Sequence, residues 1–470
     1  MKLKKAFIFT SVLFIFSMKA QTKVASIFTD NMVMQQNTKV AVWGSDKPST
    51  KISVSASWGE KSTTKSDAKG KWKLFIKTKK ADNDASYTLE IKGSEKLVFK
   101  NILLGEVWLA SGQSNMEMPI KGFPGQPINN SNEFVLNGYN SQIRLFNVKK
   151  NPSLKVLDIV KGTWQEATPE TVFKFSAVAY LYGKILQEKI DVPLGIICSS
   201  FGGTRIESWT DKATLENSKL ELDLRIRTKT PKALKNSPSV LYNGMIHPLI
   251  PYTIKGAIWY QGESNRGNSE QYSELFNNMV SSWRQKWNIG DFPFYFVQIA
   301  PFIYKNKQES AYLREAQLNA MQTTKNTGMA VTLDIGAARF IHPSEKEKIA
   351  KRLAYWALAK DYGFKGISYS GPIFKSIKIE NDKIIVNFDY AKNGVTSYGK
   401  ELDNFTLAGD DRIFYPAKAT IKRGKLVVTS DKVKNPVAVR YGWTNYLQGG
   451  LFNLAGLPAS SFRSDNWEKE

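Results

Sequence analysis

The 470-residue sequence predicts an α/β protein in which a parallel sheet flanked by helices lies between two β-rich regions. Short runs of alternating apolar and polar residues fill residues 21–101, which predicts a small N-terminal β-sandwich. From residue 102 to 365, apolar strands alternate with longer helical stretches, and this alternation is typical of a parallel sheet covered on both faces. Short β-type runs return over residues 366–470 and predict a C-terminal β-rich region.

The first twenty residues have the pattern of an export signal. Lys2, Lys4 and Lys5 precede an apolar run over residues 6–18, and the small Ala20 ends the segment. The run is shorter than the roughly 20 apolar residues that a membrane-spanning helix needs. We therefore expect a cleaved signal at residues 1–20, a mature chain without a transmembrane anchor, and a periplasmic or secreted location.

The expected elements follow in chain order. The N-terminal runs are Lys39–Trp43, Lys51–Ser55, Lys71–Ile76 and Tyr87–Ile91, at the spacing of an antiparallel module. In the middle region, expected helices at Ala177–Glu188 and Tyr272–Trp287 precede strands at Val192–Cys198 and Phe294–Ile299. A further helix is expected to begin at Ser344, where Ser344 and Glu347 have the spacing of a capping box, and to end near residues 361–363.

Composition excludes several function classes. The chain has two histidines and one cysteine, so it can form no internal disulfide and has no closely spaced ligand set for zinc. The single cysteine, Cys198, lies in an apolar run and is expected to be buried. No phosphate-binding glycine loop and no dinucleotide-binding fingerprint occur, so we expect neither a metal nor a cofactor.

The formal net charge is +24, which raises the question of nucleic-acid binding. The lysines are scattered over strands and loops, without a dense basic arm or a recognised binding motif, so we expect no nucleic-acid partner. A solvated basic surface explains the charge, and attraction of acidic polysaccharides or an anionic cell envelope is the functional alternative.

The segment Gly105–Met116 is the most informative part of the chain. Its apolar strand runs into a Gly-Gln-Ser-Asn turn, in which Gly112 permits a sharp bend and Ser114 follows the carboxyl end of the strand. Ligands of open α/β sheets bind at this edge. Ser114 is therefore a candidate nucleophile, although a serine in this position is also compatible with a turn or a helix cap.

This segment resembles the first motif of the SGNH hydrolases, and specifically of the sialate O-acetylesterase-like family. Further motifs in the order of that family support the resemblance: Ser200–Thr204 with Glu207–Trp209, Leu241–Ile246, Trp259–Asn265, Arg314–Gln317 and Ile341–Pro343. The resemblance implies an SGNH-hydrolase-like fold, with Ser114 attacking an acetyl ester.

The two histidines leave a simple choice of general base. His342 lies in a loop late in the chain, where the resemblance places the catalytic histidine in its Ile-His-Pro motif. His247 leads toward a buried strand at residues 255–260 and is expected to be a packed structural residue.

The acid that would orient His342 is not where the family has it, because Arg339 and Phe340 occupy the positions where an acid is expected. The remaining candidates are Asp334, at the end of an expected strand over residues 330–333, and Glu263. A backbone carbonyl is the third alternative, and it would leave a Ser-His dyad.

The resemblance implies an oxyanion hole made by the backbone N–H groups of Ser114 and Gly203 and the side-chain amide of Gln261. Gln113 and Asn115 flank the nucleophile and are candidates to hold its loop or touch substrate. Glu263 is expected either to hold the turn, to touch substrate hydroxyls or to be a buried structural acid. Trp209 is a candidate for stacking on a sugar ring, with a place in the core as the alternative.

Together these observations predict an exported serine esterase that removes acetyl groups from O-acetylated carbohydrate, either sialic acids or plant polysaccharides, through an acetyl-enzyme intermediate. The alternative is a carbohydrate-binding pseudoenzyme that has lost turnover with its acid. A lipid esterase is disfavoured because the chain has no long apolar lid segment. The sequence sets no expectation for the oligomeric state.

Overall fold

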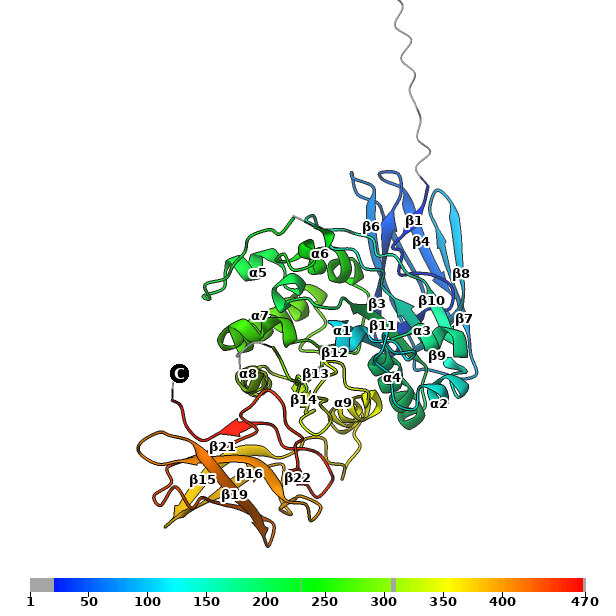
Figure 1. The fold of residues 1–470 in the computed structure, drawn as a ribbon. Coiled ribbons are helices and arrows are strands. Elements are labelled where there is room, and N and C mark those ends of the chain that lie inside the picture. The colour runs from blue at the N-terminus through cyan, green and yellow to red at the C-terminus, as the bar shows by residue number, and fades with distance from the viewer. Residues whose placement is uncertain (1–20, 229, 306–309, 468–470) are drawn as a thin grey trace, which may run out of the picture.

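The computed structural model describes residues 21–228, 230–305 and 310–467, and the side chains of residues 231 and 232 are not described. The expected export signal, residues 1–20, lies outside the described residues. Figure 1 shows an N-terminal β module, a central α/β region and a C-terminal β region following one another along the molecule. Within the described residues, none of the helices has the length and apolar character needed to cross a membrane.

The N-terminal module contains two groups of strands. One group is a sheet in the order β1-β3-β6, and the other joins β5, β4 and β7 to the first part of β8 by antiparallel pairing. Alternate residues of β4, β6 and β7 are buried, as the sequence pattern predicts for strands with one covered face. The bounds are β1 Lys23–Val24, β3 Lys39–Ser45, β4 Lys51–Ala56, β5 Lys61–Lys65, β6 Lys71–Lys77 and β7 Tyr87–Lys92.

The long strand β8, Lys96–Gly112, connects this module to the central sheet without a break. Its first half pairs with β7, and Leu103–Gly105 pair in parallel with β2, Val33–Gln35. Its second half is fully buried and pairs in parallel with strands on both sides. The strand therefore crosses the change of sequence texture at residues 101 and 102, and no linker separates the two regions.

The central sheet has the order β10-β9-β11-β8-β12-β13-β14. All neighbours pair in parallel except β10, which is antiparallel to β9. The bounds are β9 Asn140–Asn147, β10 Trp164–Ala167, β11 Leu194–Ser200, β12 Gly256–Tyr260, β13 Phe294–Val297 and β14 Thr327–Ala330. The chain passes from β11 on one side of β8 to β12 on its other side, so the order of the strands reverses at β8.

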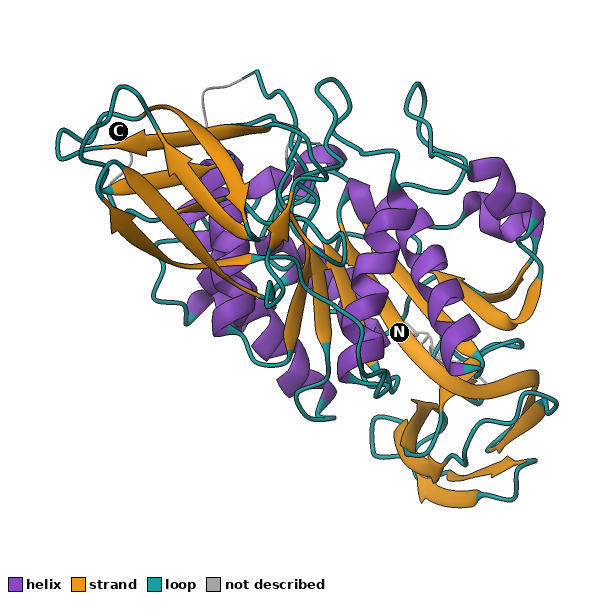
Figure 2. Cartoon of the chain, turned by 90° about the horizontal axis from the view of Figure 1, so that it is seen from below, coloured by secondary structure: helices purple, strands orange, loops and turns teal. Residues whose placement is uncertain are grey.

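Helices cover both faces of this sheet (Figure 2). On one face α4, Ala177–Ile190, packs against α9, Lys346–Lys360; on the other α7, Ser269–Trp287, packs against α8, Ser310–Thr323. The shorter helices are α1 Ser114–Glu117, α2 Ser131–Leu136, α3 Pro169–Lys174, α5 Lys212–Glu216 and α6 Pro231–Leu234. Short 3-10 or π turns span Ile206–Trp209, Tyr242–Ile246, His247–Leu249 and Glu263–Asn268.

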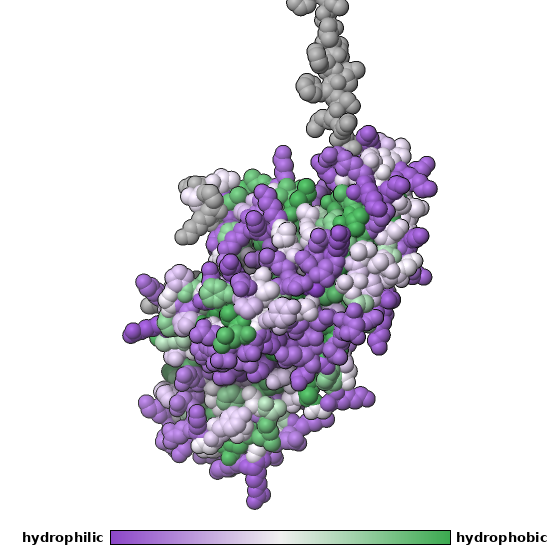
Figure 3. Space-filling model, turned by 90° about the vertical axis from the view of Figure 1, so that its right-hand side faces the viewer, coloured by the Kyte–Doolittle hydropathy of each residue, from purple (hydrophilic) through white to green (hydrophobic). Residues whose placement is uncertain are grey.

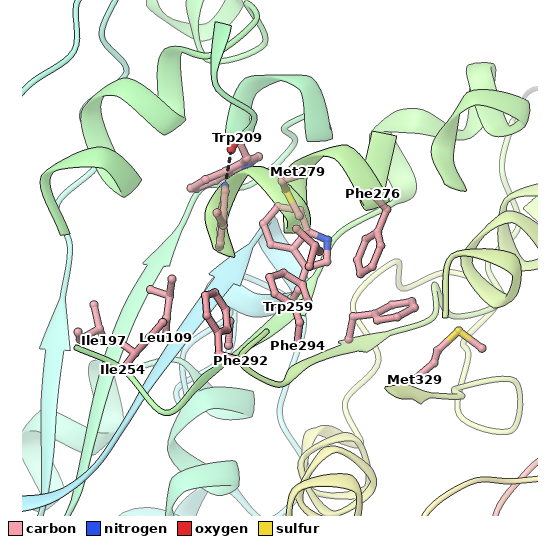
Figure 4. Packing of buried hydrophobic residues seen from close by; sticks show 14 of the residues in the cluster. Leu109, Ile197, Trp209, Ile254, Trp259, Phe276, Met279, Phe292, Phe294 and Met329 are labelled. Atoms are coloured by element: carbon pink, nitrogen blue, oxygen red, sulfur yellow. Dashed lines mark hydrogen bonds between the residues drawn. The ribbon is translucent and has the colours of Figure 1, made fainter. Parts of the chain in front are cut away.

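Alternate residues of the central strands enter two separate cores. Leu109, Trp259 and Phe294 belong to the core beneath α7 (Figure 4), whereas Trp108 and Tyr295 face α4 and α9. Full burial of each such side chain contributes roughly 2–3 kcal/mol. The sheet edge that carries the candidate site is therefore supported from both faces.

Two expected boundaries are corrected by the structure. Helix α9 begins at Lys346 instead of Ser344, with Glu345 at the N-cap position and no side-chain cap. The Ser344 carbonyl accepts hydrogen bonds from the backbone N–H groups of Lys346 and Asn129. Strand β14 ends at Ala330, so Asp334 lies in the loop beyond the strand rather than directly at its end.

The C-terminal region forms an antiparallel sheet in the order β15-β16-β20-β19-β18-β21-β23, with a separate β17-β22 pair. Arg314 of α8, fully buried, anchors this region by donating to the carbonyl oxygens of Gly442 and Thr444 and to Ser461 Oγ. The bounds are β15 Ile373–Glu380, β16 Lys383–Asp389, β17 Val395–Thr396, β18 Leu402–Ala408, β19 Tyr415–Lys422, β20 Lys425–Thr429, β21 Ala438–Tyr441, β22 Phe452–Asn453 and β23 Phe462–Arg463.

Hydrophilic residues dominate the face seen in Figure 3, and apolar residues occur there in small separate groups. This distribution agrees with the high content of lysine and arginine, 66 of 470 residues. A surface of this kind carries its positive charge in water, where salt screens it.

Candidate active site

Three neighbouring strands of the central sheet end at the same place. Ser114 follows β8, Gly202 and Gly203 follow β11, and Gln261 follows β12. Because these strands are parallel and adjacent, their carboxyl ends lie at one edge, at the point where the strand order reverses. Ligands of open α/β sheets bind at such a point.

The turn that carries Ser114 is tightly packed against β12. Gly112 has a φ of 134°, and a Cβ at this position would lie 2.2 Å from the carbonyl oxygen of Tyr260. Only glycine fits here, both sterically and conformationally. The next residue, Gln113, donates its N–H to the same carbonyl at 2.9 Å. Ser114 then begins α1 as a half-buried residue.

The glycine loop after β11 lies directly against the nucleophile turn. A methyl group on Gly202 would be 3.1 Å from Ser114 Cβ, and the Gly202 N–H donates to Glu117 Oε2 at 2.6 Å. Gly203 has a φ of 68°, which glycine adopts without strain. In the described part of the chain, the N–H groups of Ser114 and Gly203 have no hydrogen-bond acceptor. They are therefore available to an oxyanion.

Gln261 was expected to be a third oxyanion donor, but its side-chain N–H groups are already donated within the protein. Its side chain is fully buried, and Nε2 donates both hydrogens, to the Thr204 carbonyl at 2.9 Å and to Asn265 Oδ1 at 2.7 Å. Its Oε1 accepts from the Tyr272 hydroxyl at 3.1 Å. With its donors occupied, Gln261 fixes the backbone beside the glycine loop.

His342 is oriented by an amide instead of a carboxylate. Its Nδ1 lies 2.7 Å from Gln126 Oε1, and its ring packs edge-on against Phe123 with centroids 5.2 Å apart. An amide oxygen can only accept, so Nδ1 carries the proton and Nε2 has a free lone pair. Burial, together with the positive charge of Lys346, lowers the pKa of His342 to about 4.

The two carboxylates proposed to orient His342 both bond elsewhere. Asp334 accepts two hydrogen bonds from Arg352 of α9, at 2.8 and 2.7 Å. Glu263 Oε1 accepts from Asn115 Nδ2 at 2.7 Å. Among the described residues, His342 hydrogen-bonds to neither of them. The hydrogen-bond partner of His342 Nδ1 is instead the side-chain amide oxygen of Gln126.

Asn115 connects the nucleophile turn to the histidine loop. Its Nδ2 also donates to the carbonyl of Ile341 at 3.1 Å, and its Oδ1 accepts from Lys346 Nζ at 2.5 Å. Since Asn115 follows Ser114 and Ile341 precedes His342, one buried amide ties the two candidate catalytic residues together across more than 200 positions of sequence.

The buried Lys346 and the half-buried Glu263 bond to the two ends of this amide and can carry opposite charges. Burial lowers the pKa of Lys346 to about 7, whereas the charge of Glu263 opposes this change. Burial raises the pKa of Glu263 above its usual value. Glu263 Oε2 is buried and has no hydrogen-bond partner among the described residues.

The remaining candidates have mainly structural contacts. Gln113 is buried, and its Oε1 accepts from the Gly262 N–H at 3.3 Å. Trp209 lies in the core, with 0% of its surface exposed to solvent. Its ring packs edge-on against Trp259, and its indole N–H donates to Thr204 Oγ1. The expectation that Trp209 stacks on a sugar is corrected, because no face of its ring is open.

Two further expectations concern residues outside the site. His247 hydrogen-bonds the Leu157 carbonyl through Nδ1 at 3.0 Å, which agrees with a structural role. Cys198 is buried at 2% exposure and is a free thiol. Over the described residues, no group of three or more His, Cys, Asp or Glu side chains is arranged to hold a metal ion.

Three contributors to the site were not found from the sequence: Gln126, Glu117 and Lys346. Glu117 carried a weak signal, since it lies one helical turn after Ser114. Gln126 and Lys346 reach the site from a loop and a helix far along the chain. Their spacing in sequence gives no indication of a shared role.

The chain was compared with known proteins. Residues 104–355, more than half of the chain, match the model of the family described as carbohydrate esterase, sialic acid-specific acetylesterase. The sialate O-acetylesterases of Pongo abelii and Homo sapiens are each 30% identical, over 94% of this chain and 92% of those proteins. The crystal structure of a carbohydrate acetylesterase from Xanthomonas citri is 35% identical, covers 95% of this chain and 100% of its own, and has a TM-score of 0.86.

Proposed function

Because the chain belongs to the sialic acid-specific acetylesterase family of carbohydrate esterases and is a carbohydrate O-acetylesterase, we propose that it works as a serine hydrolase with Ser114 as nucleophile and His342 as base. The observation that carries this proposal is the Asn115 amide, which ties the turn of Ser114 to the loop of His342. The competing role, glycan binding without turnover, is less well supported because the family is one of esterases. The acid that was missing from the sequence is replaced by Gln126.

In the proposed first step, Ser114 Oγ attacks the acetyl carbonyl carbon while Nε2 of His342 takes the hydroxyl proton. The proton stays on Nε2, and the Nδ1 proton remains hydrogen-bonded to Gln126. The tetrahedral oxyanion accepts from the N–H groups of Ser114 and Gly203. His342 Nε2 then gives its proton to the departing sugar oxygen as the C–O bond breaks, so that the sugar leaves as its free hydroxyl and acetyl-Ser114 remains.

In the second step, water attacks the acetyl-enzyme and His342 takes its proton. Collapse of the second tetrahedral intermediate releases acetate and returns the proton to Ser114 Oγ. The low pKa of His342 keeps the imidazole neutral and competent as a base over the ordinary range of pH.

The test is acetate release by the mature protein from O-acetylated sialic acid, acetylated galacturonan and acetylated xylan. Ser114→Ala should abolish release, with a loss of at least ~10⁴-fold in kcat. Ser131→Ala, which changes a half-buried serine on α2, serves as the matched control and should retain full activity. Release that persists in Ser114→Ala would contradict the proposed nucleophile. No release by the wild type would favour the binding alternative.

A further inference from the structure

A cavity opens beside the nucleophile turn, on the side of β8 where β11 and β9 lie. Its volume is about 450 Å³. Its wall contains Glu117 of α1, three residues after Ser114, and its floor contains the buried side chains of Ser176, Cys198 and Ser200. Four lysines also belong to the lining: Lys121, Lys149, Lys150 and Lys174. We call this cavity the lysine pocket.

The positive charge of the lysine pocket is not cancelled by its own acid. Glu117 is the carboxylate of the lining, and it already binds Lys150 Nζ at 2.5 Å and the Gly202 N–H at 2.6 Å. The nearby Glu170 lies within the electrostatic range of Lys174, at the other end of α3. Among the described residues, Lys121, Lys149 and Lys174 form no ion pair, so the pocket has a surplus of positive charge.

The lysine pocket approaches the nucleophile turn through Glu117, which lines the pocket and bonds to the Gly202 N–H. A methyl group on Gly202 would be 3.1 Å from Ser114 Cβ and 3.2 Å from Glu117 Oε2, so the serine and the pocket's carboxylate lie against the same point of the backbone. Phe201, which precedes Gly202, has the ammonium groups of Lys150 and Lys235 over its ring, at 4.8 and 5.0 Å.

The chemistry of the lining selects the ligand. Ammonium groups stabilise carboxylates by charge-assisted hydrogen bonds, and a concave site strengthens their field over that of a flat surface. The floor adds the hydroxyl of Ser200, whose contact among the described residues is the weak one with the Cys198 thiol at 3.5 Å. This hydroxyl is free to donate to an anion.

We propose that the lysine pocket binds the carboxylate of an acidic sugar, so that the enzyme prefers O-acetylated acidic glycans to neutral ones. The inference rests on the proposed function, because it places the acetyl group at Ser114 and the carboxylate beside it. A sialic acid and a galacturonic acid both supply this carboxylate, and the experiment separates them.

The experiment compares the wild type with the triple variant Lys121→Gln, Lys149→Gln, Lys174→Gln. Lys150 is kept because its contact with Glu117 supports the Gly202 loop. The matched control is Lys51→Gln, Lys61→Gln, Lys65→Gln, which removes the same charge from exposed positions on β4 and β5. The substrates are O-acetylated sialic acid, acetylated oligogalacturonate, acetylated xylo-oligosaccharide and 4-nitrophenyl acetate.

We expect the pocket variant to lose about 10- to 100-fold in kcat/KM on an acidic substrate through a higher KM. Its kcat/KM on the neutral oligosaccharide and on 4-nitrophenyl acetate should stay within about 2-fold of the wild type, as should the control variant on all four substrates. The acidic substrate that shows the loss identifies the source of the carboxylate. An equal loss on neutral and acidic substrates, an equal loss in the control, or no loss would overturn the proposal.

Failure of the esterase mechanism can be told apart from failure of the pocket. If neither the wild type nor Ser114→Ala releases acetate, the proposed function fails. Calorimetric titration with free N-acetylneuraminate and trigalacturonate then tests the lysine pocket alone. Weaker binding by the pocket variant than by the charge-matched control supports the pocket, and equal or undetectable binding to all proteins overturns it.

Discussion

Asp334 and Glu263 are the two carboxylates expected from the sequence to orient His342, and they differ in how many of their oxygens are hydrogen-bonded. Asp334 is fully matched by the two N–H groups of Arg352, and both side chains are largely buried. Glu263 has one oxygen on Asn115 and one buried oxygen without a partner among the described residues. The first arrangement holds the loop before His342 onto α9. The second leaves one buried carboxylate oxygen unpaired next to the nucleophile turn.

The largest effect that this comparison predicts is on stability. Asp334→Asn leaves the buried guanidinium of Arg352 without its counter-charge, and should lower the free energy of unfolding by about 3 kcal/mol. Glu263→Gln keeps an acceptor for Asn115 and should cost less than about 1 kcal/mol. Urea unfolding followed by tryptophan fluorescence measures both. Equal destabilisation by the two variants would remove the distinction between the carboxylates.

The next effect concerns the amide that orients the base. Gln126→Ala removes the acceptor of Nδ1–H, so that the proper tautomer and orientation of His342 are lost, and kcat should fall by about 100-fold. Gln126→Glu should restore much of this rate.

The same two variants should also differ in how kcat/KM depends on pH. A carboxylate at residue 126 stabilises the imidazolium and raises the pKa of His342, so the acid limb of kcat/KM should move to higher pH in Gln126→Glu. A merely structural role for Gln126 predicts no such movement, and an unmoved limb would contradict the orientation by the amide.

Lys346 should act on the base from the other side. Its charge lowers the pKa of His342, so Lys346→Met raises that pKa and moves the acid limb of kcat/KM upward from about pH 4. Below this limb the imidazole is protonated and activity is lost. Lys348→Met, at an exposed position of the same helix, is the control and should leave the limb in place. A limb unchanged in both variants would exclude an electrostatic effect of Lys346.

The smallest effect is expected on the solvent side of α9. Lys351 pairs with Glu347 at 2.6 Å, with about half of the lysine side chain exposed, and water screens such a pair. Lys351→Gln should change the free energy of unfolding by no more than about 0.5 kcal/mol. Thermal unfolding with Asp334→Asn alongside compares the exposed and buried ion pairs of one helix. A loss as large as that of Asp334→Asn would show that burial is not what separates them.

Much of the architecture could be predicted because it depends on local patterns. Alternating burial in β4 and β6 follows from the alternation of apolar and polar residues, and α4 and α7 lie where longer helical stretches between apolar strands were expected. The start of α9 was missed because Ser344 and Glu347 have the spacing of a capping box, whereas Glu345 is the N-cap residue and no side chain caps the helix.

The residues of the candidate site likewise fall into those that local motifs predict and those that depend on the folded structure. Ser114 and His342 could be nominated from motifs, since a strand-to-turn signal and a choice between two histidines are both visible in the chain. The partner of His342 could not, because it depends on which loops meet in space. Asp334 was a reasonable candidate by position, but Arg352 lies close enough on α9 to bind both of its oxygens.

The most direct test of the account is the pH dependence of Ser114 modification by a fluorophosphonate, with the adduct located by peptide mass spectrometry. The account predicts a single adduct on Ser114, absent in His342→Ala, whose rate of formation falls by half near pH 4 because His342 stays neutral above that value. An adduct on another residue, or a half-maximal rate near the ordinary histidine pKa of about 6.5, would contradict it.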